Sequence, residues 1–120
     1  MSNETAAQLQ TVNVSIDEAR KSVDKRDALA RLVKNRDFKT IISTGFFEKE
    51  AIRTVALKSH PAFQGDQEQL DLDRIMFAIG SLQQYLLTIR AQGDQMERGI
   101  AEMEQTRDEL MVEDLEAGNV

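Results

Sequence analysis

Apolar residues in the last part of the chain recur at alternating spacings of three and four. Counted from Leu72 as a and Ile75 as d, this spacing marks about six consecutive heptads. The a and d positions are Leu72, Ile75, Ile79, Leu82, Leu86, Ile89, Gly93, Met96, Ile100, Met103, Arg107, Leu110 and Asp114. The register continues through Gly93 without a skip, so the pattern predicts one long helix over 67–115. A hairpin that turns near Gly93 is the alternative.

The apolar stripe on this predicted helix changes width along its length. Between 70 and 90, extra apolar side chains broaden it to most of the circumference, which is typical of a helix buried on several sides. These are Leu70, Met76, Phe77, Ala78, Tyr85 and Leu87. After Gly93 only a narrow seam remains, which is typical of a helix that touches a single partner.

The N-terminal third predicts one amphipathic helix. Residues 1–14 have no lasting period and are predicted to form a flexible tail. Ser15 begins the helix predicted over 15–34, where Ser15 and Glu18 have the spacing of a capping box. Ile16, Ala19, Val23, Ala30 and Val33 then fall on one stripe.

A short helical pair is predicted over 37–58. Asp37 is expected to cap its first helix, and Gly45 is expected to end that helix in the left-handed conformation. Proline disfavours helical geometry in the residue before it, so the loop over 59–66 begins around His60. Together these elements predict a flexible tail followed by a single all-α domain over 15–120. The expected fold is an elongated helical bundle with a long, coiled-coil-like C-terminal helix, two short helices and an N-terminal amphipathic helix.

Length determines what must cover the seam after Gly93. A helix over 67–115 would be about 74 Å long, whereas a compact domain of this size is roughly 35 Å across. The first helix, about 30 Å long, could cover the seam by running antiparallel to it, or the seam could pair with its mate in a second copy. The predicted oligomer or partner interface is Met96, Ile100, Met103, Arg107 and Leu110. Arg107 at an a position also suggests an acid nearby.

Charge is distributed unevenly. Residues 1–19 carry three acids and no base, residues 20–58 carry 11 bases and five acids, and residues 59–120 carry four bases and 13 acids. The whole chain has a net charge of −6. Such a distribution favours contact between basic and acidic segments, within one chain or between neighbours.

Composition argues against most chemistry. The 120 residues include no cysteine and one histidine, which excludes disulfides, a thiol nucleophile and Cys-based metal centres. His60 lies before a proline in a loop and is expected to be structural or exposed. No catalytic, cofactor-binding or metal site is predicted. No segment has the apolar length needed to span a membrane, and no signal pattern opens the chain, so a soluble intracellular protein is expected.

The basic cluster over 20–39 is a candidate for nucleic-acid binding. Asp24, Asp27 and Asp37 interrupt it, no aromatic platform accompanies it, and the chain as a whole is acidic. These features argue against direct binding. The converse hypothesis is that the acidic helix mimics a phosphate backbone and occupies a nucleic-acid-binding host protein.

Two segments resemble small, mostly uncharacterised helical proteins encoded by tailed bacteriophages. The likeness extends roughly over 15–115 and ends in an acidic helix rich in Met and Glu. It is carried by Lys34–Lys39, Gly45–Phe47, Glu50, Ala51, Arg53 and Ile79–Tyr85. The resemblance implies a gene among those for virion morphogenesis and a role near head or tail assembly.

The expected function is therefore that of a non-enzymatic, self-associating phage protein. It would act as a minor virion component or assembly factor, in the host cytoplasm or in the virion. Phe38, Phe46 and Phe47 are candidates for docking a partner, although such phenylalanines are more often part of a core. The alternative is a phage-encoded inhibitor that binds a host enzyme or nucleic-acid-binding protein through its acidic face.

Overall fold

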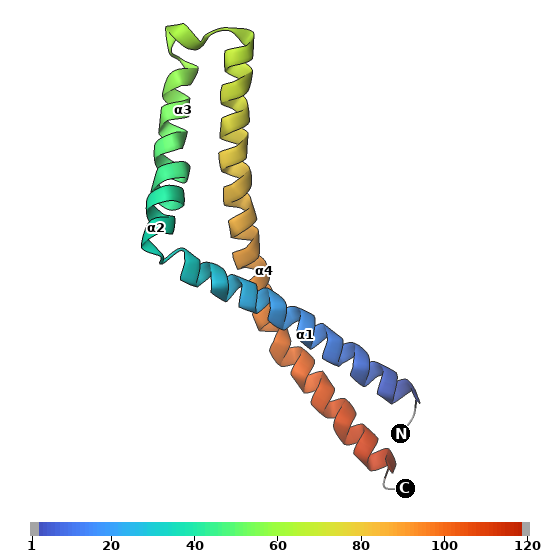
Figure 1. Cartoon of the computed structure of the whole chain (residues 1–120). Coiled ribbons are helices and arrows are strands. Elements are labelled where there is room, and N and C mark those ends of the chain that lie inside the picture. Colours follow the sequence, from blue (N-terminus) through green and yellow to red (C-terminus); the bar gives the residue numbers. More distant parts are fainter. Residues whose placement is uncertain (1–2, 119–120) are drawn as a thin grey trace. The chain divides into compact units, whose positions relative to one another are not determined.

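The computed structural model describes residues 3–118, and all of its regular structure is helical (Figure 1). This confirms the predicted all-α class. The elements are α1 (Asn3–Leu32), α2 (Arg36–Phe38), the π-helix η1 (Lys39–Glu50), α3 (Ala51–Lys58), the 3₁₀-helix η2 (Pro61–Phe63) and α4 (Asp66–Gly118). The described chain forms two compact units: the first comprises 3–27 and 89–118, and the second comprises 28–88.

The first unit is an antiparallel pair of helices. The beginning of α1 and the end of α4 lie at the same end of this unit (Figure 1). The less exposed positions of α1 recur at spacings of four and three, as in a heptad repeat. They are Thr5, Leu9, Val12, Ile16, Ala19, Val23 and Arg26. On α4 the a and d positions from Gly93 onward are buried or half-buried, so the two repeats face each other.

The structure corrects the predicted start of the first helix. α1 begins at Asn3 rather than Ser15, so 3–14 are helical and the flexible tail predicted for them is wrong. Residues 1 and 2 of that predicted tail lie outside the described residues. Ser15 lies inside α1 and caps nothing. Short helical segments become stable mainly by packing an amphipathic face, and here α4 supplies the surface for 3–14.

The second unit is also an antiparallel helix pair. The continuous helical segment formed by α2, η1 and α3 runs alongside the first part of α4 (Figure 1). Leu72 and Ile79 of α4 are buried, and Thr54 of α3 is fully buried and donates its hydroxyl to the Glu50 carbonyl (2.7 Å). Lys58 forms an ion pair with Asp73 (2.6 Å). This ion pair joins the end of α3 to the first turns of α4 across the loop between them.

The segment 36–58 differs from the predicted short helical pair at its start and in its middle. Asn35 rather than Asp37 caps it, because its Oδ1 accepts from the N–H groups of Asp37 (2.9 Å) and Phe38 (3.0 Å). Gly45 does not end a helix, and no described residue has a positive φ. A Cβ at Gly45 would lie 2.6 Å from the carbonyl oxygen of Thr40. Glycine is needed for this close approach inside η1, not for a left-handed turn.

We expect Asn35→Ala to lower the free energy of unfolding of the second unit by about 1 kcal/mol, because two N–H groups lose their acceptor. Asn35→Asp keeps a carboxylate oxygen at the same place and should retain most of the stability. Urea denaturation followed by circular dichroism measures both. Equal losses for Ala and Asp would show that the cap is not what stabilises this helix start.

The long C-terminal helix is confirmed. α4 is a single helix over Asp66–Gly118 and is unbroken at Gly93 and Gly99, as the continuous heptad register predicted. It begins where Gln69 N–H donates to the Gly65 carbonyl (2.9 Å) and the Glu68 carboxylate accepts from Gly65 N–H (3.3 Å). The acids in this first turn suit the positive end of the helix dipole.

Candidate interaction surfaces

The seam after Gly93 faces α1 within the first unit. The five residues predicted as an oligomer or partner interface are all half-buried there: Met96, Ile100, Met103, Arg107 and Leu110. Of the two ways to cover the seam, the structure therefore contains the intramolecular one. A second copy could use the same seam only if α1 moved away from it.

The contact with α1 explains why a glycine occupies the a position at residue 93. Gly93 is buried against Arg26, and a Cβ built on it would overlap the Cβ of Arg26 and lie 2.9 Å from the Cγ. The stem of the Arg26 side chain therefore occupies the space that any side chain at position 93 would need. Gly99 is different, since its nearest neighbour to an added Cβ would be the Cε of Met103 at 4.0 Å.

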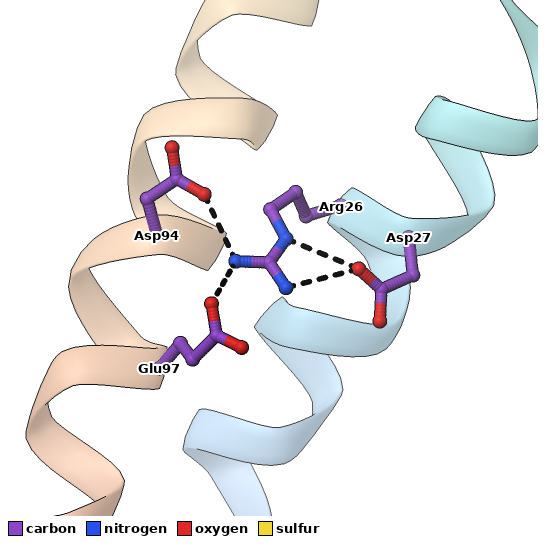
Figure 2. Close-up of polar contacts among 4 residues, drawn as sticks. All are labelled: Arg26, Asp27, Asp94 and Glu97. Atoms are coloured by element: carbon purple, nitrogen blue, oxygen red, sulfur yellow. Dashed lines mark hydrogen bonds and ion pairs between the residues drawn. The ribbon is translucent and has the colours of Figure 1, made fainter.

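The Arg26 guanidinium lies among three carboxylates (Figure 2). Its Nη1 donates to Asp94 Oδ1 (2.9 Å) and Glu97 Oε2 (2.6 Å), and its Nε and Nη2 donate to Asp27 Oδ1 (3.1 and 3.0 Å). The side chain is only 17% exposed. Hydrogen bonds, first to Glu97 and then to Asp27 and Asp94, raise the pKa of Arg26, so it stays charged at any pH the protein meets.

A second ion pair links the same two helices. Arg20 Nη2 on α1 donates to Glu104 Oε1 on α4 at 2.9 Å. With Arg26, this pair joins the basic residues of α1 to the acidic half of α4. The expected contact between oppositely charged segments therefore occurs within one chain, in the first unit.

We expect Arg26→Met to lower the melting temperature of the first unit at low ionic strength, because the apolar stem is kept while the charge among three carboxylates is lost. The difference from wild type should shrink at about 1 M salt, where ionic interactions are screened. Lys21→Met is the matched control, since the Lys21–Glu18 pair is exposed and within one helix. An equal loss at both salt concentrations would mean that packing, not charge, is what Arg26 supplies.

Arg107 has an acid beside it, as its place in the seam suggested. Its Nε donates to Oδ1 of the adjacent Asp108 at 3.2 Å, and its side chain is 28% exposed. The acid that Arg107 contacts therefore belongs to α4 itself and not to α1.

The phenylalanines considered for docking lie in the second unit. Phe38, Phe46 and Phe47 are all half-buried, and the rings of Phe46 and Phe47 are 6.0 Å apart and tilted by 48°. Phe38 ends α2, and the other two belong to η1. Each therefore presents only part of its ring to a partner.

The most exposed aromatic side chain was not among the residues predicted for docking. Phe77 of α4 is 77% exposed, and with Gly80, Ser81 and Gln84 it lines a shallow groove. Leu70 and Leu87 are 44% and 50% exposed on the same helix. This segment was predicted to be buried on several sides. In the structure it is buried only on the side that carries Leu72 and Ile79. One feature of the sequence could have pointed to this surface: no charged residue lies between Arg74 and Arg90.

An acidic groove lies on the C-terminal part of α4, in the first unit. Most of its lining side chains are carboxylates, and all of these except Glu104, which pairs with Arg20, are exposed. It is lined by Ala101, Glu104, Gln105, Asp108, Glu109, Val112, Glu113 and Glu116. This surface attracts cationic groups and repels a second acidic surface.

Chemical candidates are few in the described part of the chain. His60 Nδ1 accepts from Ala62 N–H (3.0 Å), and its ring meets the edge of Phe63. His60 therefore caps η2. Over 3–118, no group of three or more His, Cys, Asp or Glu side chains is arranged to hold a metal ion. In the same residues, no helix combines the length and apolar character needed to cross a membrane.

Comparison with known proteins adds no relative. The chain matches no protein-family model, no curated protein and no solved structure.

Proposed function

We propose that this protein acts through protein–protein contacts, as a non-enzymatic, self-associating component of a tailed bacteriophage. Its role would be that of a minor virion protein or an assembly factor. The observation that supports this proposal is the exposed, uncharged surface of α4 around Phe77 in the second unit. The phage assignment is supported only by the sequence resemblance described above.

The physical argument is that a single helix pair buries one side of each helix. Burying one large apolar side chain contributes about 1.5–3 kcal/mol. In the second unit several such side chains remain at least 44% exposed: Ile41, Ile52, Val55, Leu70, Phe77, Tyr85 and Leu87. A protein that keeps so many apolar groups in water gains stability when another protein surface covers them.

The test is whether the protein is part of the particle. Phage particles purified on a density gradient and analysed by mass spectrometry should contain it at a fixed number of copies per particle, with synthesis late in infection. An assembly factor would instead be found in immature particles and lost on maturation. Absence from both kinds of particle would refute a structural or assembly role.

The acidic groove on α4 supports a second candidate, an inhibitor that binds a host protein in place of a nucleic acid. Its five carboxylates follow one helix face: Glu104, Asp108, Glu109, Glu113 and Glu116. Expression of the protein alone should then impair host growth. Neutralising Glu109 and Glu113 to glutamine should relieve that effect, whereas Phe77→Ser should not. Growth unaffected by the wild-type protein would rule this candidate out.

A further inference from the structure

One surface of α4 in the second unit lies away from its buried positions. We call Leu70, Phe77, Gly80, Ser81, Gln84 and Leu87 the Phe77 face. Leu70, Phe77 and Gln84 are seven residues apart, and so are Gly80 and Leu87, so these side chains share one side of the helix. The buried Leu72 and Ile79 face the other helix of the pair.

We propose that the Phe77 face binds the same face of a second copy, with the two α4 helices antiparallel about a two-fold axis between Gly80 and Ser81. This inference rests on the proposed function, because it names the partner and the residues for self-association. It also moves the association surface from the seam after Gly93, which faces α1, to a surface that is open in the second unit.

The lack of charge indicates a protein partner rather than a membrane. Residues 75–89 are free of Asp, Glu, Lys and Arg. They extend about 22 Å along a helix, which is shorter than the roughly 30 Å of a bilayer core. Arg74 and Arg90 flank this stretch. A short uncharged helix surface between charged turns suits the centre of an interface with a polar rim.

The shape of the Phe77 face favours a second copy. A two-fold interface requires one patch that is complementary to itself. Phe77 projects from this patch, and the small residues Gly80 and Ser81 leave a depression beside it, since a Cβ added at Gly80 would meet no atom within 4 Å. Antiparallel pairing centred between Gly80 and Ser81 places each Phe77 opposite Gln84 of the other copy. The small Gly80 and Ser81 of the two copies then face each other at the axis, so the two helices can approach closely enough for each Phe77 to pack against Gln84 of the other copy.

Charge supports the same partner and the antiparallel direction. A net charge of −6 makes two copies repel each other, and the repulsion is smallest where no charged residue lies. Asp71, Asp73 and Arg74 precede the uncharged stretch with a net charge of −1, and Arg90 follows it. Antiparallel pairing brings the basic end of one stretch towards the acidic end of the other, whereas parallel pairing brings like charges together.

The area involved predicts a reversible dimer. Phe77, Leu70 and Leu87 together offer roughly 300 Å² of exposed apolar surface per copy, given that one aromatic side chain buries 150–250 Å². The two copies together therefore bury about 600 Å² of apolar surface, well short of the 1,200–2,000 Å² total of stable interfaces, which is typical of a weak, transient contact. The dimer population should therefore rise with protein concentration.

Sedimentation velocity over a range of concentrations tests the interface in the full chain. Wild type should shift from monomer to dimer, and Phe77→Glu should raise the dissociation constant by about 30-fold or more, as for a central aromatic residue. Leu115→Glu is the matched control, because Leu115 is 67% exposed on the other unit and its substitution should leave dimerisation unchanged. Circular dichroism should show unchanged helicity, because Phe77 is largely exposed in the single chain.

Cysteine cross-linking tests the direction, because the chain contains no natural cysteine. With a short thiol-specific cross-linker, Ser81→Cys should form a dimer rapidly, since its mate lies next to it across the axis. Leu70→Cys lies on the same face but about 30 Å from its mate along an antiparallel pair, and should not cross-link. Cross-linking of both variants would indicate parallel pairing and refute the proposed arrangement.

The remaining outcomes separate this inference from the proposed function. A wild-type chain that stays monomeric at all concentrations refutes self-pairing, yet the protein can still be present in particles. A dimer that survives Phe77→Glu, with no Ser81→Cys cross-link, shows that the copies associate through another surface. Absence from particles together with a dimer sensitive to Phe77→Glu would refute the assembly role and leave the interface in place.

Discussion

Replacing Gly93 with alanine is expected to lower the free energy of unfolding by about 1–2 kcal/mol, because a packing cost of up to about 3 kcal/mol is partly offset by the roughly 1 kcal/mol by which alanine favours a helix over glycine. The added Cβ would overlap the Cβ of Arg26, so the two helices of the first unit would have to separate at this contact. Overpacking of this kind typically costs 1–3 kcal/mol. Separation would also lengthen the hydrogen bonds from Arg26 to Asp94 and Glu97. Urea denaturation monitored by circular dichroism gives the value directly.

The chain offers a matched control in the same helix. Gly99→Ala adds the same methyl group, but the nearest atom is the flexible end of Met103 at 4.0 Å. Because alanine favours the helix over glycine by about 1 kcal/mol, this variant should be more stable than wild type. Equal effects at Gly93 and Gly99 would show that the helices do not approach each other closely at Gly93.

Truncating Ile16 to alanine should lower the free energy of unfolding by about 2–5 kcal/mol, the range for large-to-small changes at buried positions. Ile16 is 1% exposed and is the most buried large apolar side chain of the first unit. Counted from the contact of Arg26 with Gly93, it falls opposite Met103 of the seam. Thermal and urea denaturation should both show the loss.

Val14 supplies the comparison for this variant. It is 54% exposed, and Val14→Ala should change the free energy of unfolding by less than about 0.5 kcal/mol.

Light scattering of Ile16→Ala adds a test of the seam as an oligomer interface. If Met96, Ile100, Met103 and Leu110 pair with a second copy once α1 loosens, Ile16→Ala should associate more than wild type. Association unchanged in this variant would count against the seam.

The helix α1 shows why part of the fold escaped sequence reasoning. Its facing positions include Thr5 and Arg26, which do not belong to a hydrophobic stripe. The spacing of four and three runs from Thr5 to Arg26, but a polar residue at its first position and a charged residue at its last obscure it. The signal becomes clear only when the partner helix is known, since α4 has Gly93 where α1 has the bulky Arg26.

One of the two candidate surfaces on α4 could be located from the sequence, and the other could not. The half-buried seam of α4 was correctly located by its heptad spacing, because spacing alone decides which side chains share one side of a helix. Phe77 was read as buried with its apolar neighbours. A hairpin of two helices has one inner side, so it buries Leu72 and Ile79 and leaves Phe77 in solvent.

The amino-acid sequence by itself determined the helical class, the continuous C-terminal helix and the positions of its seam. Those features depend on local propensity and on periodicity, which are properties of neighbouring residues. Only the tertiary structure decided that α1 begins at Asn3 and covers the seam, that Gly93 admits Arg26, and that the uncharged surface around Phe77 stays open. Each of these depends on what lies opposite a residue, and contacts between residues far apart in the chain are not encoded in the spacing of either segment alone.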